Sequence, residues 1–175
     1  MPRTTPLPAT FAADLMDRVR RIVWCTLATT DAAGRPRTRI VHPWWEGATA
    51  WVTTRPGSPK TAHLEAAPWA SLLYWDPSHA VVTAECDARM EDDPATRARV
   101  WDAIAADPPP YGFDPAPMFP EGPGAPAFGL LRLDARRIEL AGALGDPPPA
   151  QTVWRRRGRA SHVVDPVFPG SAAPS

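Results

Sequence analysis

The chain has 175 residues, 44% of them hydrophobic, and its 19 basic and 19 acidic side chains leave a net charge of zero. That length suits a single domain with a proper core, and the charge balance gives no reason to expect nucleic acid or an anionic membrane as a partner. The sequence has no apolar run near the roughly 18 residues of a membrane span, no apolar N-terminal stretch typical of a signal peptide, and no CxxC pair. We therefore expect a soluble, cytoplasmic protein without a disulfide framework or a metal site.

The first third of the chain is predicted to form one helix and three strands. Phe11, Leu15 and Val19 recur every four residues, which is typical of one face of a helix, and Thr10 is its expected N-cap. β-Branched and apolar runs then alternate with short turns, a spacing that favours an antiparallel meander. The expected elements are a helix over 10–22 and strands over 23–30, 35–45 and 48–54.

The next part of the chain adds two helices and three strands. A short second helix must end before Pro68, because the residue before a proline disfavours the helical conformation. Asp93 followed by Pro94 is typical of an N-cap and a first helical position, so a third helix is expected to start there. The further strands are expected over 69–75, 80–90 and 127–143. Six mostly consecutive strands with about three short helices favour a mainly β fold built as a small antiparallel barrel.

A single domain is expected over residues 1–145, with loose residues 1–9 at its start. The segment 107–126 is too rich in proline for regular structure, but it belongs to the domain because a strand follows it. Proline and arginine dominate the C-terminal segment 146–175, which we expect to be loose.

Lys60 is the only lysine in a chain that has eighteen arginines. Ser58 as N-cap and Pro59 as the first helical residue place Lys60 in the first turn of the second helix. A cation opposes the helix dipole at that point, so an acidic residue would be preferred for stability alone. A phosphate held by the lysine, the serine hydroxyl and free backbone N–H groups would explain the arrangement. The alternative is a lysine that is merely solvated.

Arginines alternate along the second predicted strand. Arg35, Arg37 and Arg39 point to one face of that strand, and the residues between them point to the other. Such a row is either a solvated face or a face that meets an anion beside the Lys60 helix. The strand pattern leaves both readings open.

Three segments together resemble the pyridoxamine 5′-phosphate oxidase-like family of split-barrel flavoproteins. They are RIV at 39–41, TTRPGSPKTAHLEAAP at 53–68 and SLLYW at 71–75, in the family's order and at its distances. The resemblance implies a six-stranded antiparallel split β-barrel of Greek-key type, normally a homodimer, with flavin bound between the subunits. The strands and helices predicted from the sequence pattern agree with that fold.

The resemblance implies cofactor contacts residue by residue. Arg39, Ile40 and Val41 match the strand along the flavin, and Lys60 matches the phosphate lysine of the family. Pro59 stands where many members carry arginine, so Arg37 or Arg55 is expected to substitute. The implied cofactor-binding set is Arg37, Arg39, Ile40, Val41, Thr53, Thr54, Arg55, Ser58, Pro59 and Lys60.

Two departures argue against vitamin B6 oxidation. A glutamine that contacts flavin in the oxidase proper falls at Ala80, so that contact is absent. The C-terminal segment of the oxidase that grips pyridoxal is not reproduced here. We therefore do not expect pyridoxamine phosphate to be the substrate.

The proline-rich loop supplies most of the predicted substrate pocket. Its apolar side chains are unusual for a disordered linker, and a loop of this length is usually functional when it is ordered. We expect it to cover the cofactor ring, with Tyr111 or Phe113 in contact; the alternative is that these aromatic residues only staple the loop to the barrel. One of the adjacent Trp44 and Trp45 is expected to face a ligand or partner. The predicted substrate pocket is Trp44, Tyr111 and Phe113.

No side chain stands out as a catalytic acid, base or nucleophile, which is compatible with chemistry performed by a cofactor. The first hypothesis is an oxidoreductase that moves a hydride between FMN, or alternatively the deazaflavin coenzyme F-420, and a small organic substrate. The second is a non-catalytic protein that stores or carries flavin or another planar cofactor.

Overall fold

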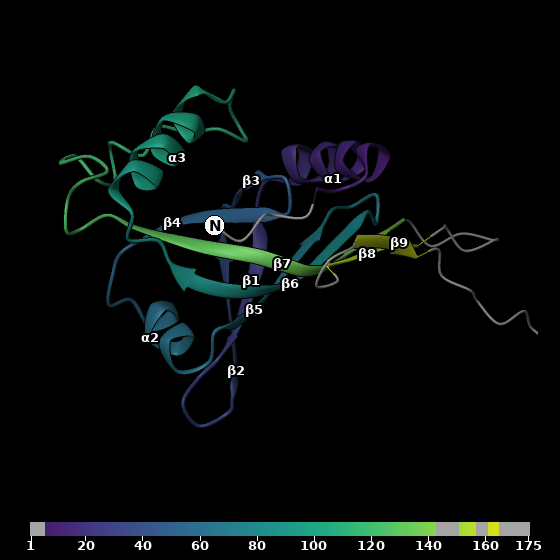
Figure 1. The fold of residues 1–175 in the computed structure, drawn as a ribbon, viewed down its shortest axis with the longest axis horizontal. Coiled ribbons are helices and arrows are strands. Elements are labelled where there is room, and N and C mark those ends of the chain that lie inside the picture. The colour runs from purple at the N-terminus through teal and green to yellow at the C-terminus, as the bar shows by residue number, and fades with distance from the viewer. Residues whose placement is uncertain (1–5, 143–150, 157–160, 165–175) are drawn as a thin grey trace, which may run out of the picture.

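A computed structural model describes residues 6–142, 151–156 and 161–164 of the chain, and this part holds three helices and nine strands (Figure 1). The helices are α1 (Ala9–Ile22), α2 (Pro59–Ala66) and α3 (Pro94–Ala106). The strands are β1 (Cys25–Thr30), β2 (Pro36–Val41), β3 (Trp44–Glu46), β4 (Thr49–Thr54), β5 (Trp69–Trp75), β6 (Val81–Met90), β7 (Gly129–Ala141), β8 (Thr152–Arg156) and β9 (Ser161–Val164). The fold is mainly β with three helices, as predicted, but the described residues form nine strands where six were expected, because the strand expected over 35–45 is divided in two and β8 and β9 were not expected.

One antiparallel sheet curls into a split β-barrel, with the strand order β2-β1-β5-β6-β7-β4-β3. β7 is the longest strand, and it crosses the middle of the molecule in Figure 1. It pairs with β6 along one edge, and the other edge pairs with β4 in its first half and with β8 in its second. The sheet does not close, because β2 and β3 stand at the two ends of the order.

The core fills the inside of the curled sheet. Cys25, Leu27 and Thr29 of β1 are buried, and the residues between them are not, so this strand alternates between core and outer face. Helix α1 places its predicted apolar face against β5 and β6, and Leu15 and Val19 on that face are fully buried. Helix α2 packs against β1 and β6 at the other side of the barrel.

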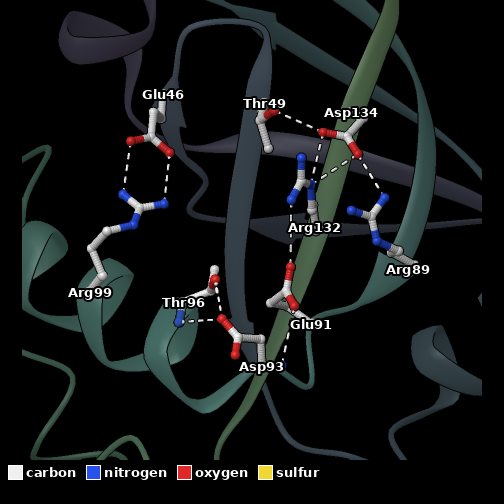
Figure 2. Close-up of polar contacts among 9 residues, drawn as sticks. All are labelled: Glu46, Thr49, Arg89, Glu91, Asp93, Thr96, Arg99, Arg132 and Asp134. Carbon is white, nitrogen blue, oxygen red and sulfur yellow. Dashed lines mark hydrogen bonds and ion pairs between the residues drawn. The ribbon is translucent and has the colours of Figure 1, made fainter. Parts of the chain in front are cut away.

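A polar network ties three strands together around Asp134 of β7 (Figure 2). Its carboxylate accepts hydrogen bonds from Thr49 Oγ1 at 2.8 Å, from Arg89 Nη1 at 2.8 Å and from Arg132 Nε at 2.9 Å. Burial raises the pKa of Asp134, but the bonds from Thr49 and Arg132 and the charges of Arg132 and Arg89 outweigh it and leave the pKa below its ordinary value. The network therefore stabilises the junction of β4, β6 and β7.

Helix α3 begins as predicted. The Asp93 carboxylate caps it by accepting the backbone N–H of Thr96 at 2.9 Å. Further along the helix, Arg99 forms a two-pronged ion pair with Glu46 of β3, which is also drawn in Figure 2. These contacts fix α3 beside the end of the sheet that β3 occupies.

Two local expectations were wrong. The strand predicted over 35–45 is divided into β2 and β3 by Pro43, which has no N–H to donate to a strand ladder. Helix α1 begins one residue earlier than expected, and its N-cap position is taken by Pro8 rather than Thr10.

Residues 151–156 and 161–164 of the C-terminal segment also differ from the expectation of a loose end, whereas the rest of that segment and residues 1–5 of the expected loose start lie outside the described residues. β8 pairs with β7 through Ile138 and Trp154, and the Trp154 side chain is fully buried. The physical reason is that β7 extends past β4, so its free edge accepts a further strand. The proline and arginine content of 146–175 concealed the apolar pair Val153 and Trp154, both of which are buried.

No helix in the described ranges is long and apolar enough to cross a membrane.

Candidate functional site

A pocket of about 600 Å³ lies where the sheet fails to close. Only His42 and Pro43 separate β2 from β3 in sequence, although the two strands end opposite sides of the sheet. Residues of β2, β4 and α2 form walls of the pocket, and the proline-rich loop, the α1–β1 junction and the β2–β3 junction contribute the rest. The lining residues are Trp24, Ile40, Val41, His42, Val52, Thr53, Lys60, Pro109, Pro110, Gly112, Phe113 and Met118. Such a volume lies within the range that accepts a drug-sized ligand or cofactor.

One cation, Lys60, lines this pocket, and the charge of Arg39 lies close to it. Burial lowers the pKa of Lys60, and the nearby charge of Arg39 lowers it further. Burial also lowers the pKa of Arg39. Most arginines of the described chain pair with a carboxylate, but within the described residues neither Arg39 nor Lys60 does. An anion placed between them would relieve their mutual repulsion.

Arg39 is held in place by groups on β1 and α2. Its Nη1 donates to Thr29 Oγ1 at 2.7 Å and to the Leu27 carbonyl at 3.3 Å. His63 Nδ1 lies 3.0 Å from Thr29 Oγ1 and 3.5 Å from Arg39 Nη2. Because a guanidinium only donates, Nδ1 of His63 is the acceptor in its contact with Arg39. The guanidinium is therefore oriented toward α2, the helix that carries Lys60.

The start of α2 matches the prediction in sequence position. Ser58 is the N-cap and Pro59 the first helical residue, but the Ser58 side chain makes no capping bond. Its Oγ lies 3.4 Å from Thr54 Oγ1. Thr53 lines the pocket, whereas Thr54 is buried and Arg55 is exposed. The hydroxyls of Ser58 and Thr54 thus meet beside the first turn of α2.

The arginine row on β2 divides between two roles. The strand register places Arg39 opposite Leu27 and Arg37 opposite Thr29, on the inner face of the sheet. Arg35 and Arg37 both pair with Asp31 in the β1–β2 turn, at 2.9 and 3.0 Å. These two arginines are half exposed or more, and they do not line the pocket. Only Arg39 belongs to the group around Lys60.

Of the two loop residues predicted for the substrate pocket, one lines the pocket and the other anchors the loop to the core. Phe113 lines the pocket, and its ring centroid lies 4.7 Å from that of His42. Tyr111 is buried: its hydroxyl accepts the Trp45 backbone N–H at 2.6 Å, and burial raises its pKa to about 12. Trp44 is also buried and donates Nε1–H to Asp107 at 2.6 Å. Neither Tyr111 nor Trp44 lines the pocket.

A second hollow, of about 690 Å³, spans β1, β5, β6, β7 and β8. Four arginines line it, but carboxylates offset much of their charge: Arg137 pairs with Glu85, and both Arg136 and Arg156 pair with Asp87. It contains none of the predicted site residues.

The comparison with known families decides what kind of protein carries this pocket. The family model described as pyridoxamine 5′-phosphate oxidase matches residues 12–142, three quarters of the chain. The chain belongs to this family. No curated protein matches the sequence.

Solved structures of the pyridoxamine 5′-phosphate oxidase family have the same fold. An FMN-binding protein of Nostoc punctiforme related to this oxidase has 19% identity and a TM-score of 0.68, covering 94% of this chain and 100% of that one. PhzG of Burkholderia lata, in complex with tetrahydrophenazine-1-carboxylic acid, has 19% identity and a TM-score of 0.64, covering 89% of this chain and 87% of that one. An F-420 reductase has 16% identity and a TM-score of 0.52, covering 70% and 94%. At these identities the likeness establishes the fold alone.

The predicted site residues of this pyridoxamine 5′-phosphate oxidase family member did not include Val52, Pro109, Pro110 and Gly112 of the pocket lining, nor four further residues around the pocket. Trp24, His42 and Met118 line it, and His63 lies beside Arg39. His63 follows Lys60 by three residues on α2, so helical periodicity could have placed both on one face. The other three come from the α1–β1 junction, the β2–β3 junction and the loop, and no local pattern connects these segments.

Proposed function

We propose that the protein is an oxidoreductase that binds FMN, or alternatively the deazaflavin coenzyme F-420, and moves a hydride to or from a small organic substrate. The observation that carries the proposal is Lys60 in the lining of an otherwise largely apolar pocket, with the charge of Arg39 close to it and, within the described residues, no carboxylate paired with either cation. A planar cofactor with a phosphate tail has this same division between an apolar ring and an anionic end.

The polar end fits a phosphate. Lys60 and Arg39 would hold its negative charge, and Thr53 at the pocket wall can donate a hydroxyl hydrogen bond. The backbone N–H of Lys60 lies in the first turn of α2, where the helix dipole favours an anion. Thr29 and His63 would act indirectly, because they keep the Arg39 guanidinium turned toward this turn.

The rest of the pocket fits a flat ring. Ile40, Val41 and Val52 supply apolar walls from β2 and β4. Phe113 and Met118 approach from the proline-rich loop, so they would border the substrate and limit the access of water. When bound, the cofactor supplies the hydride transfer itself, and the chain's own residues bind, orient and shield the reacting groups.

We further propose that two copies assemble through the outer face of the sheet. Trp24, Ile40, Leu73 and Trp75 are 46% to 64% exposed, which is unusual for large apolar residues so close together. The register places Thr26 of β1 between Ile40 and Leu73, so these side chains occupy one continuous surface. Ile40 and Trp24 also line the pocket, so a partner on this face would border the cofactor.

An absorbance and fluorescence titration of the purified full-length chain with FMN and with F-420 tests the proposal. Saturable binding of one of them, with a stoichiometry of one per chain, is expected. Binding of neither would refute the proposal. The storage or carrier role would be favoured instead if the cofactor binds but is neither reduced by a hydride donor such as NADPH nor, once reduced, reoxidised by a quinone.

A further inference from the structure

His42 is oriented in the pocket by a backbone carbonyl. Its Nε2 lies 2.8 Å from the Tyr111 carbonyl oxygen, and its ring lies against Trp24 and Phe113, with centroids 5.0 and 4.7 Å away. Because a carbonyl oxygen only accepts, Nε2 must carry a proton. The neutral ring therefore has its lone pair on Nδ1, and the bond to Tyr111 persists when the ring is protonated.

Nδ1 is available to a ligand. Within the described residues Nδ1 has no hydrogen-bond partner. Nδ1 is also not one of the fully buried polar atoms without a partner, so part of its surface is accessible. The ring itself is only half-buried and lines the pocket beside Ile40 and Val41. A histidine that is fixed through one nitrogen and available at the other, in a ring that lines a pocket, is the arrangement that proton transfer needs.

The surroundings favour the neutral ring as the resting state. Burial lowers the pKa of His42, and the bond to the Tyr111 carbonyl raises it in part. The charged groups on the surrounding elements are Lys60 of α2 in the same pocket, Arg20 of α1, whose guanidinium lies 5.0 Å from the Tyr111 ring centroid, and Asp107 after α3, which pairs with Arg20. Asp107 offsets the charge of Arg20, and the aromatic contacts would stabilise a transient imidazolium.

We propose that His42 is the acid–base residue of this pocket, exchanging a proton at Nδ1 with a substrate bound against the cofactor ring. The inference rests on the proposed function. In the oxidative direction, Nδ1 would take the proton from the O–H or N–H group of a substrate whose neighbouring carbon gives up a hydride, and a bound flavin would supply the two-electron acceptor for that hydride. A C=O or C=N bond would form in the substrate, and the proton would then pass from Nδ1 to water.

The substrate class follows from this assignment. It would be a small alcohol or amine in the oxidative direction, or a carbonyl, imine or quinone in the reductive direction. The loop aromatic Phe113 beside His42 favours a substrate with a planar or apolar body.

The first test reads the proton directly in the full-length protein. ¹⁵N NMR of the histidine rings over a pH series should give a neutral His42 with its proton on Nε2 and a titrating Nδ1, both without cofactor and with FMN bound. A proton on Nδ1, or an imidazole that does not titrate while the protein stays folded, would overturn the proposal.

The second test uses p-nitrophenol, a planar acid whose colour reports its ionisation. The FMN-loaded wild type should bind it as the phenolate while the His42 imidazole becomes protonated. His42→Gln retains a donor for the Tyr111 carbonyl but cannot take up a proton, and it should weaken binding by about 10- to 100-fold, the worth of a charge-assisted hydrogen bond. His42→Phe should weaken it similarly and should also lower the melting temperature, because only this variant loses the bond to the loop.

Equal binding by the wild type and His42→Gln, or no binding by the wild type at millimolar concentration, would refute the role of His42. If His42 had only a structural role, ionisation of the bound p-nitrophenol would not change the protonation of the His42 imidazole. If neither FMN nor F-420 binds, the proposed function fails instead, and the NMR titration of the cofactor-free protein still decides whether Nδ1 exchanges protons.

Discussion

The hydroxyl of Tyr111 accepts the backbone N–H of Trp45 at 2.6 Å, so the proline-rich loop is bonded to the strand β3 that it crosses. This contact distinguishes the two aromatic residues of the loop. Tyr111 anchors the loop in the core, and Phe113, two residues later, lies at the pocket.

Tyr111→Phe is therefore expected to lower stability more than cofactor affinity. The substitution leaves the buried Trp45 N–H without an acceptor, at a cost of about 1–3 kcal/mol in the free energy of unfolding. Urea unfolding of the full-length chain measures it. Phe113→Ala is the matched comparison, and it should reduce ligand affinity while leaving the unfolding midpoint closer to that of the wild type. The reverse pattern would mean that the two residues have exchanged roles.

Lys60→Ala should weaken cofactor binding by about 1.5–3 kcal/mol, the worth of a charge-assisted hydrogen bond. Titration calorimetry with FMN and with F-420 measures the change. Arg37→Ala is the control, because Asp31 holds that arginine away from the pocket. Unchanged affinity in Lys60→Ala would place the phosphate elsewhere.

Leu73→Glu should disrupt the proposed dimer. It introduces a charge into the exposed apolar surface of β5 without touching the pocket lining. Light scattering should find a dimer for the wild type and a monomer for the variant at micromolar concentration. Ala105→Glu, on the exposed side of α3, is the control and should remain dimeric. A monomeric wild type would exclude the two-chain site.

Trp154→Ala should destabilise the fold by about 3–5 kcal/mol, because it empties a fully buried aromatic site between β8 and the core. Chemical unfolding of the full-length protein measures it. Truncating the exposed neighbour Arg155 to Ala should cost much less. Similar losses for both would mean that β8 contributes little packing.

Asp134 makes stability depend on acid. Its pKa in the folded protein is below that in the unfolded chain, so it contributes stability that is fully present above the unfolded value of about 3.9 and is lost as the pH falls through the folded pKa. Asp134→Asn should lower stability at neutral pH by about 1–3 kcal/mol. The difference between the two proteins should shrink in acid, and thermal melts across pH test this. A constant difference would mean that the carboxylate charge contributes nothing.

Much of the fold could be predicted because its signals are local. The four-residue spacing of Phe11, Leu15 and Val19 identified α1, and the Asp93 cap identified the start of α3. β8 could not be predicted, since its reason for pairing is the length of β7, more than ten residues away in sequence. Pairing with β7 therefore determines the structure of β8, a segment whose proline- and arginine-rich surroundings gave no sign of a strand.

The candidate site divides in the same way. Lys60 and Thr53 could be placed at the pocket because they flank the short turn between β4 and α2. Arg37 was expected beside them, but its strand carries it toward Asp31. His42 could not be assigned, because its meaning depends on the Tyr111 carbonyl, 69 residues later.

The strand β2 ends the sheet, and within the described residues only β1 pairs with it. Ile40 and Val41 of this strand line the pocket, and the backbone N–H and C=O groups of its other edge are the same whatever side chains the strand carries. If a ligand ring is bound through backbone groups of this edge, its recognition depends little on which side chains the strand carries. Evolution can then replace most of the side chains and still keep the recognition, which is consistent with a shared fold at 19% identity or less. Divergence in this family would thus fall on the loop proposed to border the substrate, rather than on the strand proposed to meet the cofactor.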